Sequence, residues 1–213
     1  MTELGFQVLG ARPEPYAATP TLMFRLRLET IPHELIHSVA LRVQIRIEPQ
    51  RRRYSAVEES RLVELFGEAP RWGDTLKPFL WSHASIMVQG FNGATEIDLP
   101  VPCSYDLEVA GAKYLHSLED GEVPLVFLFS GSIFAKGPTG LSVTQVSWSK
   151  DVSFKFPAAT WRSLMDMYFP NGGWLRLTRE TLDALSRFKA KHALATWDHV
   201  LEALLREREE KAA

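Results

Sequence analysis

The strongest constraint on this chain is a strict alternation of apolar and charged or polar side chains in two segments near its start. LMFRLRL (residues 22–28) and VALRVQIRIE (residues 39–48) both place apolar residues at every second position, with arginines between them. A period of two is typical of a β-strand with one buried face and one wet face. We therefore predict that the two segments pair as antiparallel strands. The buried face of the second strand would carry Leu41, Val43, Ile45 and Ile47.

Local signals predict the elements in the middle of the chain. Ser55, with Glu58 three residues later, is a capping-box pattern, so we predict a helix over residues 56–66. Asn92-Gly93 stands between two strand-forming segments and predicts a β-hairpin.

Further elements follow before the chain turns helical. We predict a strand over residues 103–109 and a brief helix over residues 110–118. Residues 123–129 (VPLVFLF) are continuously apolar, which is typical of a buried strand.

The last third of the chain has helical spacing over residues 159–169, 179–192 and 197–211. Because strands come first and helices last, the order favours the α+β class. We predict an antiparallel sheet with a short inserted helix and a C-terminal helical hairpin. A mainly β domain would span residues 1–155, and a helical region packed on the sheet would span residues 156–213.

Composition excludes several functional classes. The chain has 213 residues, 46% of them apolar, with a net charge of −2, which argues against a general nucleic-acid binder. A single cysteine excludes a disulfide framework and fits a reducing cytoplasm. The most apolar run is too short to span a bilayer, and no secretory signal is expected. We expect a cytoplasmic protein without a membrane span.

The motif HELIH fits the H-E-x-x-H signature of zinc peptidases through His33, Glu34 and His37. That chemistry needs a helix, because both histidines must point to one face and the glutamate must reach the metal-bound water. The motif stands in a short gap between two alternating strands, and no third ligand belongs to a recognisable partner motif. We therefore predict no bound metal and no catalysis, and keep a zinc-dependent hydrolase as the minor alternative.

Two other features have a functional and a structural interpretation. The run Arg51, Arg52 and Arg53 suits either a phosphate-binding patch or a solvated turn, and the absence of a glycine-rich cradle in the sequence favours the turn. Cys103 suits either a thiol nucleophile or an inert buried thiol, and its apolar neighbourhood favours the second.

Aromatic and methionine side chains are concentrated in residues 154–174. Such side chains repack around different partners, so the segment suits a groove that binds polypeptides, although a helix packed on the sheet is the alternative. The residues predicted to contact a client polypeptide are Met165, Tyr168, Phe169 and Trp174, which flank the PNGG break. Glycines there would let the loop adjust to a client.

The C-terminal pattern resembles the export chaperone SecB. The resemblance consists of Phe-Pro pairs at 156–157 and 169–170, Leu-Arg-Leu at 175–177 and Asp-Ala-Leu at 183–185, in that order. SGSIF (residues 130–134) and the two early strands also resemble that family. The resemblance implies a SecB-like antiparallel sheet, with residues at about 49–120 as an insertion. The acidic docking surface of that family does not carry over, because this chain is nearly neutral.

A second resemblance covers nearly the whole chain. YDLEVAGAKYLHSLEDGEVPLVFLFSG, WRSLMDMYFPNGGWLRL and ATWDHVLEALL are similar to an uncharacterised bacterial family whose members are often encoded beside nickel-iron hydrogenase genes. The resemblance implies a role in the assembly or operation of a hydrogenase. No Cys-x-x-Cys pair or Cys/His cluster in the sequence suits nickel or an iron–sulfur cluster, so we expect no cofactor and a role through protein contact.

Two functions of the protein-binding kind remain open beside the zinc hydrolase. The leading hypothesis is a chaperone-like accessory protein that binds a hydrogenase subunit or another client. The alternative is a structural accessory subunit that stays in the mature complex. A homo-oligomer is compatible with both.

Overall fold

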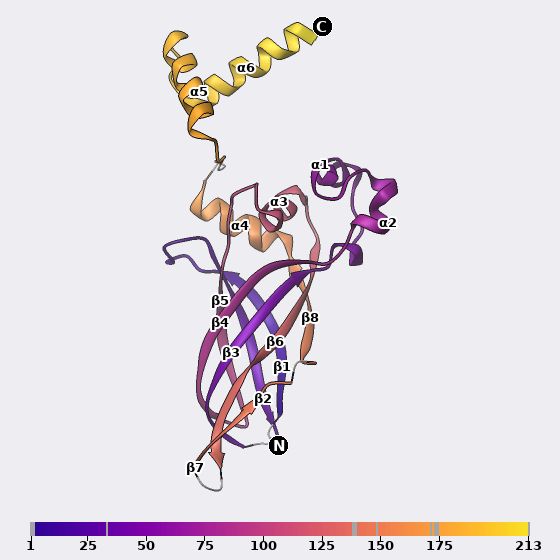
Figure 1. Ribbon diagram of the computed structural model, residues 1–213, viewed down its shortest axis with the longest axis vertical. Helices are drawn as coiled ribbons and strands as arrows, with labels where there is room; N and C mark the ends of the chain where they lie inside the picture. Colours follow the sequence, from indigo (N-terminus) through magenta and orange to yellow (C-terminus); the bar gives the residue numbers. More distant parts are fainter. Residues whose placement is uncertain are drawn as a thin grey trace. The chain divides into compact units, whose positions relative to one another are not determined.

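The computed structural model describes residues 3–32, 34–137, 140–147, 149–170, 172 and 175–212. The chain divides into two compact units, Met1–Trp174 and Leu175–Ala213 (Figure 1). The second unit holds helices α5 (Arg179–Lys191) and α6 (Trp197–Ala212). The sequence-based boundary after residue 155 marks the change from strand to helix, whereas the compact units divide after Trp174.

The described strands form two antiparallel sheets in the first unit. One sheet contains β1 (Glu3–Pro13), β2 (Thr21–Ile31) and β5 (Ala94–Pro102), in the order β1-β2-β5. The five-stranded sheet contains β3 (Leu35–Ile47), β4 (Phe79–Asn92), β6 (Glu122–Gly137), β7 (Gly140–Gln145) and β8 (Asp151–Pro157). Its order is β4-β3-β6-β7, and β8 pairs with an earlier stretch of β6 than β7 does.

The apolar faces of the two sheets pack against each other and form the core. Phe24 of β2 lies with its ring centroid 5.1 Å from that of Phe127 in β6, and Phe6 of β1 stacks on Phe129 at 4.1 Å. The predicted inward residues of β3 are 0 or 1% exposed, namely Leu41, Val43, Ile45 and Ile47. The predicted division into a core face and a wet face is therefore confirmed for both early strands.

The predicted pairing of these two strands is wrong. β2 lies between β1 and β5, while β3 lies between β4 and β6 in the other sheet. The reason is that alternation specifies which face of a strand is buried and says nothing about which strand lies beside it. Two strands that face each other across a core carry the same pattern as two neighbours in one sheet.

The hairpin predicted at Asn92-Gly93 is wrong for a related reason. Gly93, with a φ of 73°, does join β4 to β5, but these strands belong to different sheets. The carbonyl of Gly93 instead accepts a hydrogen bond of 2.8 Å from the N–H of Thr30, at the end of β2. The chain thus crosses between sheets here, and residues 49–120, expected as an insertion, supply a strand to each sheet.

The strand predicted over residues 103–109 is also wrong, because side chains there bind the backbone that a strand would need. The hydroxyl of Ser104 accepts from the N–H of Asp106 at 3.0 Å, and the Asp106 carboxylate accepts from the N–H of Glu108 at 3.0 Å. Such local bonds favour turns over a sheet ladder. The segment is a turn before α3 (Ala110–Ser117), the brief helix that the sequence predicts.

Helices of the first unit gather at one end of the strands (Figure 1). They are α1 (Ala56–Phe66), α2 (Trp72–Thr75), α3 and α4 (Ala158–Tyr168), with the single turns η1 (Pro49–Arg51) and η2 (Ala69–Arg71). The capping box of α1 is confirmed, since Ser55 and Glu58 bond each other's N–H groups. In α4, Trp161, Leu164 and Met165 are buried, and the helix contacts β1, β2 and β8.

The α+β class, the antiparallel sheets and the C-terminal pair of helices are therefore confirmed. Within the described residues, no helix combines the length and the apolar character needed to cross a membrane.

The core face of β3 gives a paired test of the fold. Ile45→Asp places a carboxylate at a position that is 0% exposed, so we expect it to lower the free energy of unfolding by about 3 kcal/mol or more. Arg46→Asp, on the exposed face of the same strand, should change it by less than about 0.5 kcal/mol. Urea unfolding of both variants measures the difference, and equal losses would contradict the assigned faces.

Candidate functional site

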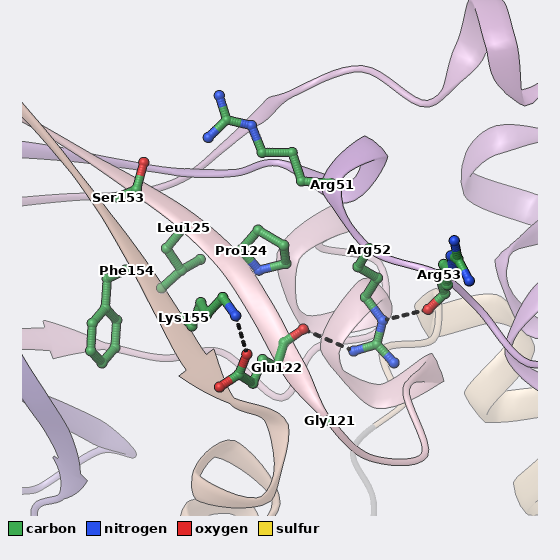
Figure 2. Close-up of a pocket in the computed structure, with 10 residues that line it drawn as sticks. All are labelled: Arg51, Arg52, Arg53, Gly121, Glu122, Pro124, Leu125, Ser153, Phe154 and Lys155. Atoms are coloured by element: carbon green, nitrogen blue, oxygen red, sulfur yellow. Dashed lines mark hydrogen bonds and ion pairs between the residues drawn. The ribbon is translucent and has the colours of Figure 1, made fainter.

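A concavity of about 640 Å³ lies where the chain leaves β3, passes η1 and runs beside β6 and β8. Figure 2 shows the arginine run on one side of it and the two strands on the other. Its polar lining includes Arg51, Arg53, Glu122, Ser153 and Lys155. Lys155 is bound to Glu122 at 3.1 Å, and Arg51 Nε lies 2.5 Å from Glu48 Oε2. The hollow is therefore open to solvent, and its Lys155 and Arg51 side chains are each paired with a carboxylate.

Arg52 behaves differently from its two neighbours, and for this residue the predicted solvated turn is wrong. Its side chain is 10% exposed and lies 2.6 Å from the Glu58 carboxylate. It also donates to the carbonyl oxygen of Asp120 at 2.9 Å. A further bond of 3.4 Å runs from Arg52 to the carbonyl oxygen of Glu122 (Figure 2). Arg52 thus fastens the start of α1 to the turn before β6, whereas Arg51 and Arg53 are exposed as predicted.

The carboxylate of Glu58 is the centre of this network. Burial raises its pKa, but hydrogen bonds from the N–H groups of Ser55 and Glu119 and the charge of Arg52 outweigh burial, so its pKa lies below the ordinary value. Next to it, the hydroxyl groups of Tyr54 and Tyr114 lie 2.8 Å apart. Burial raises the pKa of Tyr114 to about 12, so this hydroxyl stays protonated at neutral pH. The cluster therefore joins the start of α1 to α3 and the turn before β6.

A second hollow region surrounds Tyr105. One concavity of about 570 Å³ is lined by Tyr105, Trp161 and Met165, with charged Arg61, Arg162 and Asp166 around it. Another, of about 460 Å³, is lined by Tyr105 and Phe169. The rings of Tyr105 and Phe169 are stacked, with centroids 5.3 Å apart. The result is a pair of aromatic-lined hollows that share one tyrosine.

His116 lines the larger of these hollows, and its ring lies 5.9 Å from that of Tyr105. Its pKa lies below the ordinary value, first because part of the ring is removed from water and second because Arg61 is positive. The imidazole is therefore mainly neutral at neutral pH. Cys103 lines the smaller hollow, where burial raises the pKa of its thiol to about 12. This agrees with an inert thiol.

The predicted client-binding residues are not equally accessible. Met165 is 3% exposed and belongs to the core, although it lines the larger hollow. Tyr168 is half-buried, with its hydroxyl 2.9 Å from Glu14 O and 2.8 Å from Ala17 O. Phe169 is half-buried and lines the smaller hollow, and Trp174 lies outside the described residues. Their role in binding a client stays a prediction.

Sequence reasoning missed Tyr105, His116 and Arg61 as partners of this region. Arg61 belongs to α1, Tyr105 to the turn before α3, and His116 to α3, so no spacing within one element marks them. The false strand predicted over residues 103–109 also hid Tyr105, because it assigned that residue to a sheet.

The HELIH segment has no helix from Leu35 onward. β3 begins at Leu35, so His37 lies in a strand, and His33 lies outside the described residues. In this strand Ile36 is 0% exposed and Leu35 is 57% exposed, which is the alternation of a strand. In the described part of the chain, no group of three or more His, Cys, Asp or Glu side chains is gathered so that it could hold a metal.

The Glu58 network gives a test with a defined pH dependence. Glu58→Gln leaves Arg52 buried without its counter-charge, so we expect a loss of roughly 3 kcal/mol in the free energy of unfolding at pH 7. Because the folded-state pKa of Glu58 is depressed, its stabilisation is present above the ordinary pKa of 4.5 and is lost as the pH falls through the folded-state pKa.

The difference between wild type and Glu58→Gln should therefore shrink on acidification below pH 4.5. Urea unfolding across the pH range measures it. Glu59→Gln, one position along the same helix, is the control and should cost less than about 0.5 kcal/mol. A difference that is independent of pH would contradict the ion-pair role.

Comparisons with known proteins contribute a family and little else. No curated protein is similar enough in sequence to count as a relative. The structure of a β-glucosidase from Kluyveromyces marxianus matches 73% of this chain and 15% of that chain, with 6% sequence identity and a TM-score of 0.27. This TM-score is too low to indicate a shared fold. The family model of DUF6084, described as a family of unknown function, matches residues 1–213, and the chain belongs to that family.

Proposed function

We propose that this protein is a chaperone-like accessory protein that binds a polypeptide. The observation that carries the proposal is the pair of hollows that share Tyr105, one lined by Trp161 and Met165 and the other by Phe169. The half-buried rings of Tyr105 and Phe169 offer apolar contact to many side chains. Such a surface favours binding that tolerates different sequences.

Charged side chains add to this argument. Arg61, Arg162 and Asp166 also line the larger hollow, so side chains of both charge signs accompany its aromatic rings. Aromatic residues and arginine are enriched in protein interfaces. The proposal assigns no catalytic role to His116, whose neutral ring packs against Tyr105 and Trp161.

The partner that fits the second sequence resemblance is a subunit of a nickel-iron hydrogenase or of a related oxidoreductase, in the cytoplasm. The SecB resemblance supports the chaperone-like form of the proposal.

A permanent accessory subunit is the second candidate, and the second compact unit favours it. Apolar side chains of α5 and α6 are exposed, among them Leu182 at 43%, Trp197 at 44%, Leu201 at 41% and Leu205 at 65%. A two-helix unit of this size buries too little apolar surface to be stable by itself. Stable docking on another surface would supply the missing burial.

Two sets of substitutions separate the candidates. The double change Tyr105→Ala and Phe169→Ala should weaken capture of an unfolded client roughly tenfold, because two aromatic contacts are lost. Leu201→Asp with Leu205→Asp should leave that capture unchanged and should abolish co-purification with the mature enzyme only if the protein is a permanent subunit. Suppression of client aggregation and isolation of the native complex are the measurements.

Melting curves verify that both variants fold. Unchanged client capture by a folded Tyr105→Ala and Phe169→Ala variant would contradict the proposed site. The sequence predicts that Phe169 and Trp174 contact a client. The double change Phe169→Ala and Trp174→Ala should therefore also weaken the suppression of client aggregation.

A further inference from the structure

The outward-facing arginines of the two sheets have different neighbours across the strands. On the three-stranded sheet, the strand register places Asp98 directly across from Arg25 and Glu96 directly across from Arg27. Arg25 lies 3.4 Å from Asp98 and 3.1 Å from Glu96, and Arg12 lies 3.3 Å from Asp98. Each positive charge on this face therefore has a carboxylate of the same chain beside it.

On the five-stranded sheet the equivalent arginines lie among neutral side chains. Arg42 stands between Ser85 of β4 and Ser130 of β6. Arg46 stands between Leu80 and Val126 on the same two strands. Both arginines are exposed, and no carboxylate in the described part of the chain forms an ion pair with either of them.

Apolar side chains lie beside these charges on β4. Met87, across from Ala40, is 62% exposed, and Leu80, across from Arg46, is 46% exposed. A hollow of about 240 Å³ beside Arg42 is lined by Ala40, Ser85 and Met87. The outward face of β3 and β4 thus combines two positive charges that lack a carboxylate partner in the described part of the chain with accessible apolar side chains next to each of them.

The same face continues into the concavity of Figure 2. Val126, across from Arg46, pairs on its other side with Ser153 of β8, and Lys155 is the next outward residue along that strand. The carboxylates of Glu122 and Glu48 are occupied by Lys155 and Arg51. Asp151 of β8, across from Leu128, is an exposed acidic side chain on this face and forms no ion pair with another described residue.

We propose that the outward face of β3 and β4 binds an acidic polypeptide segment whose carboxylates pair with Arg42 and Arg46 and whose apolar side chains cover Met87 and Leu80. This inference rests on the proposed protein-binding function and adds the chemistry of the partner. A polypeptide fits better than a nucleic acid, because the exposed Met87 and Leu80 offer apolar contact to side chains, and the residues directly across from the arginines are Ser, Leu and Val.

The test uses a labelled peptide in which glutamates alternate with serine and leucine, bound to the full chain and followed by fluorescence anisotropy. Arg42→Ala with Arg46→Ala should weaken binding roughly fivefold at low salt, the product of two exposed ion pairs. The effect should fade as salt screens the charges. A peptide with lysine in place of glutamate should not bind.

The matched control is Arg25→Ala with Arg27→Ala on the other sheet, which removes the same charge from the same residue type in an exposed strand face. This control should bind the acidic peptide as wild type does. Equal weakening by both double variants would overturn the inference, since it would reflect net charge alone. No weakening by Arg42→Ala with Arg46→Ala, at unchanged melting temperature, would also overturn it.

Two further outcomes separate this inference from its premise. Tighter binding of a labelled single-stranded oligonucleotide, weakened by the same pair of substitutions, would assign the face to nucleic acid and overturn the inference. If Tyr105→Ala with Phe169→Ala abolishes client capture while the arginine variants leave the acidic peptide bound, the proposed function stands and this inference falls.

Discussion

The burial of two apolar sheet faces against each other is the interaction on which the rest of this structure depends. Phe24 is its most connected ring, with centroids within 6.2 Å of Trp81, Phe127, Phe154 and Phe156. These partners come from three strands, so the packing of one side chain ties distant segments together. Because the core excludes water, inward positions are apolar unless their polar atoms are hydrogen-bonded, as the hydroxyl of Thr30 is to the carbonyl of Gly93, and the outward positions are left to other demands.

The helical end depends on a second, polar fastening. Glu58 is buried and the side chain of Arg52 is largely covered, and together they bind the start of α1, the turn before β6 and the chain after η1. A buried ion pair of this kind contributes little net stability but penalises any arrangement that separates the two charges. It therefore specifies where α1 and α3 lie above the sheets, and α3 in turn contributes His116 to the hollow beside Tyr105.

This division explains what the sequence could predict. Period-two alternation predicted the buried faces of β2 and β3, and the capping box predicted α1, because both signals are local. Strand neighbours were not predictable, since Leu26 and Val43 need only an apolar environment and do not specify the strand beside them. The hollow beside Tyr105 was equally hidden, because it is assembled from a turn, α3 and α4, which no local spacing connects.

The neighbours of the outward-facing arginines are not determined by the packing of the core. Folding requires that Arg25 and Arg42 face water and places no requirement on the charge of their neighbours. Carboxylates nevertheless stand across from Arg25 and Arg27, while serine, leucine and valine stand across from Arg42 and Arg46. Opposite charges across strands stabilise a sheet slightly, so the fold by itself favours pairing on both faces. The five-stranded sheet lacks this stabilisation at Arg42 and Arg46. These two arginines can therefore pair with the carboxylates of an acidic partner.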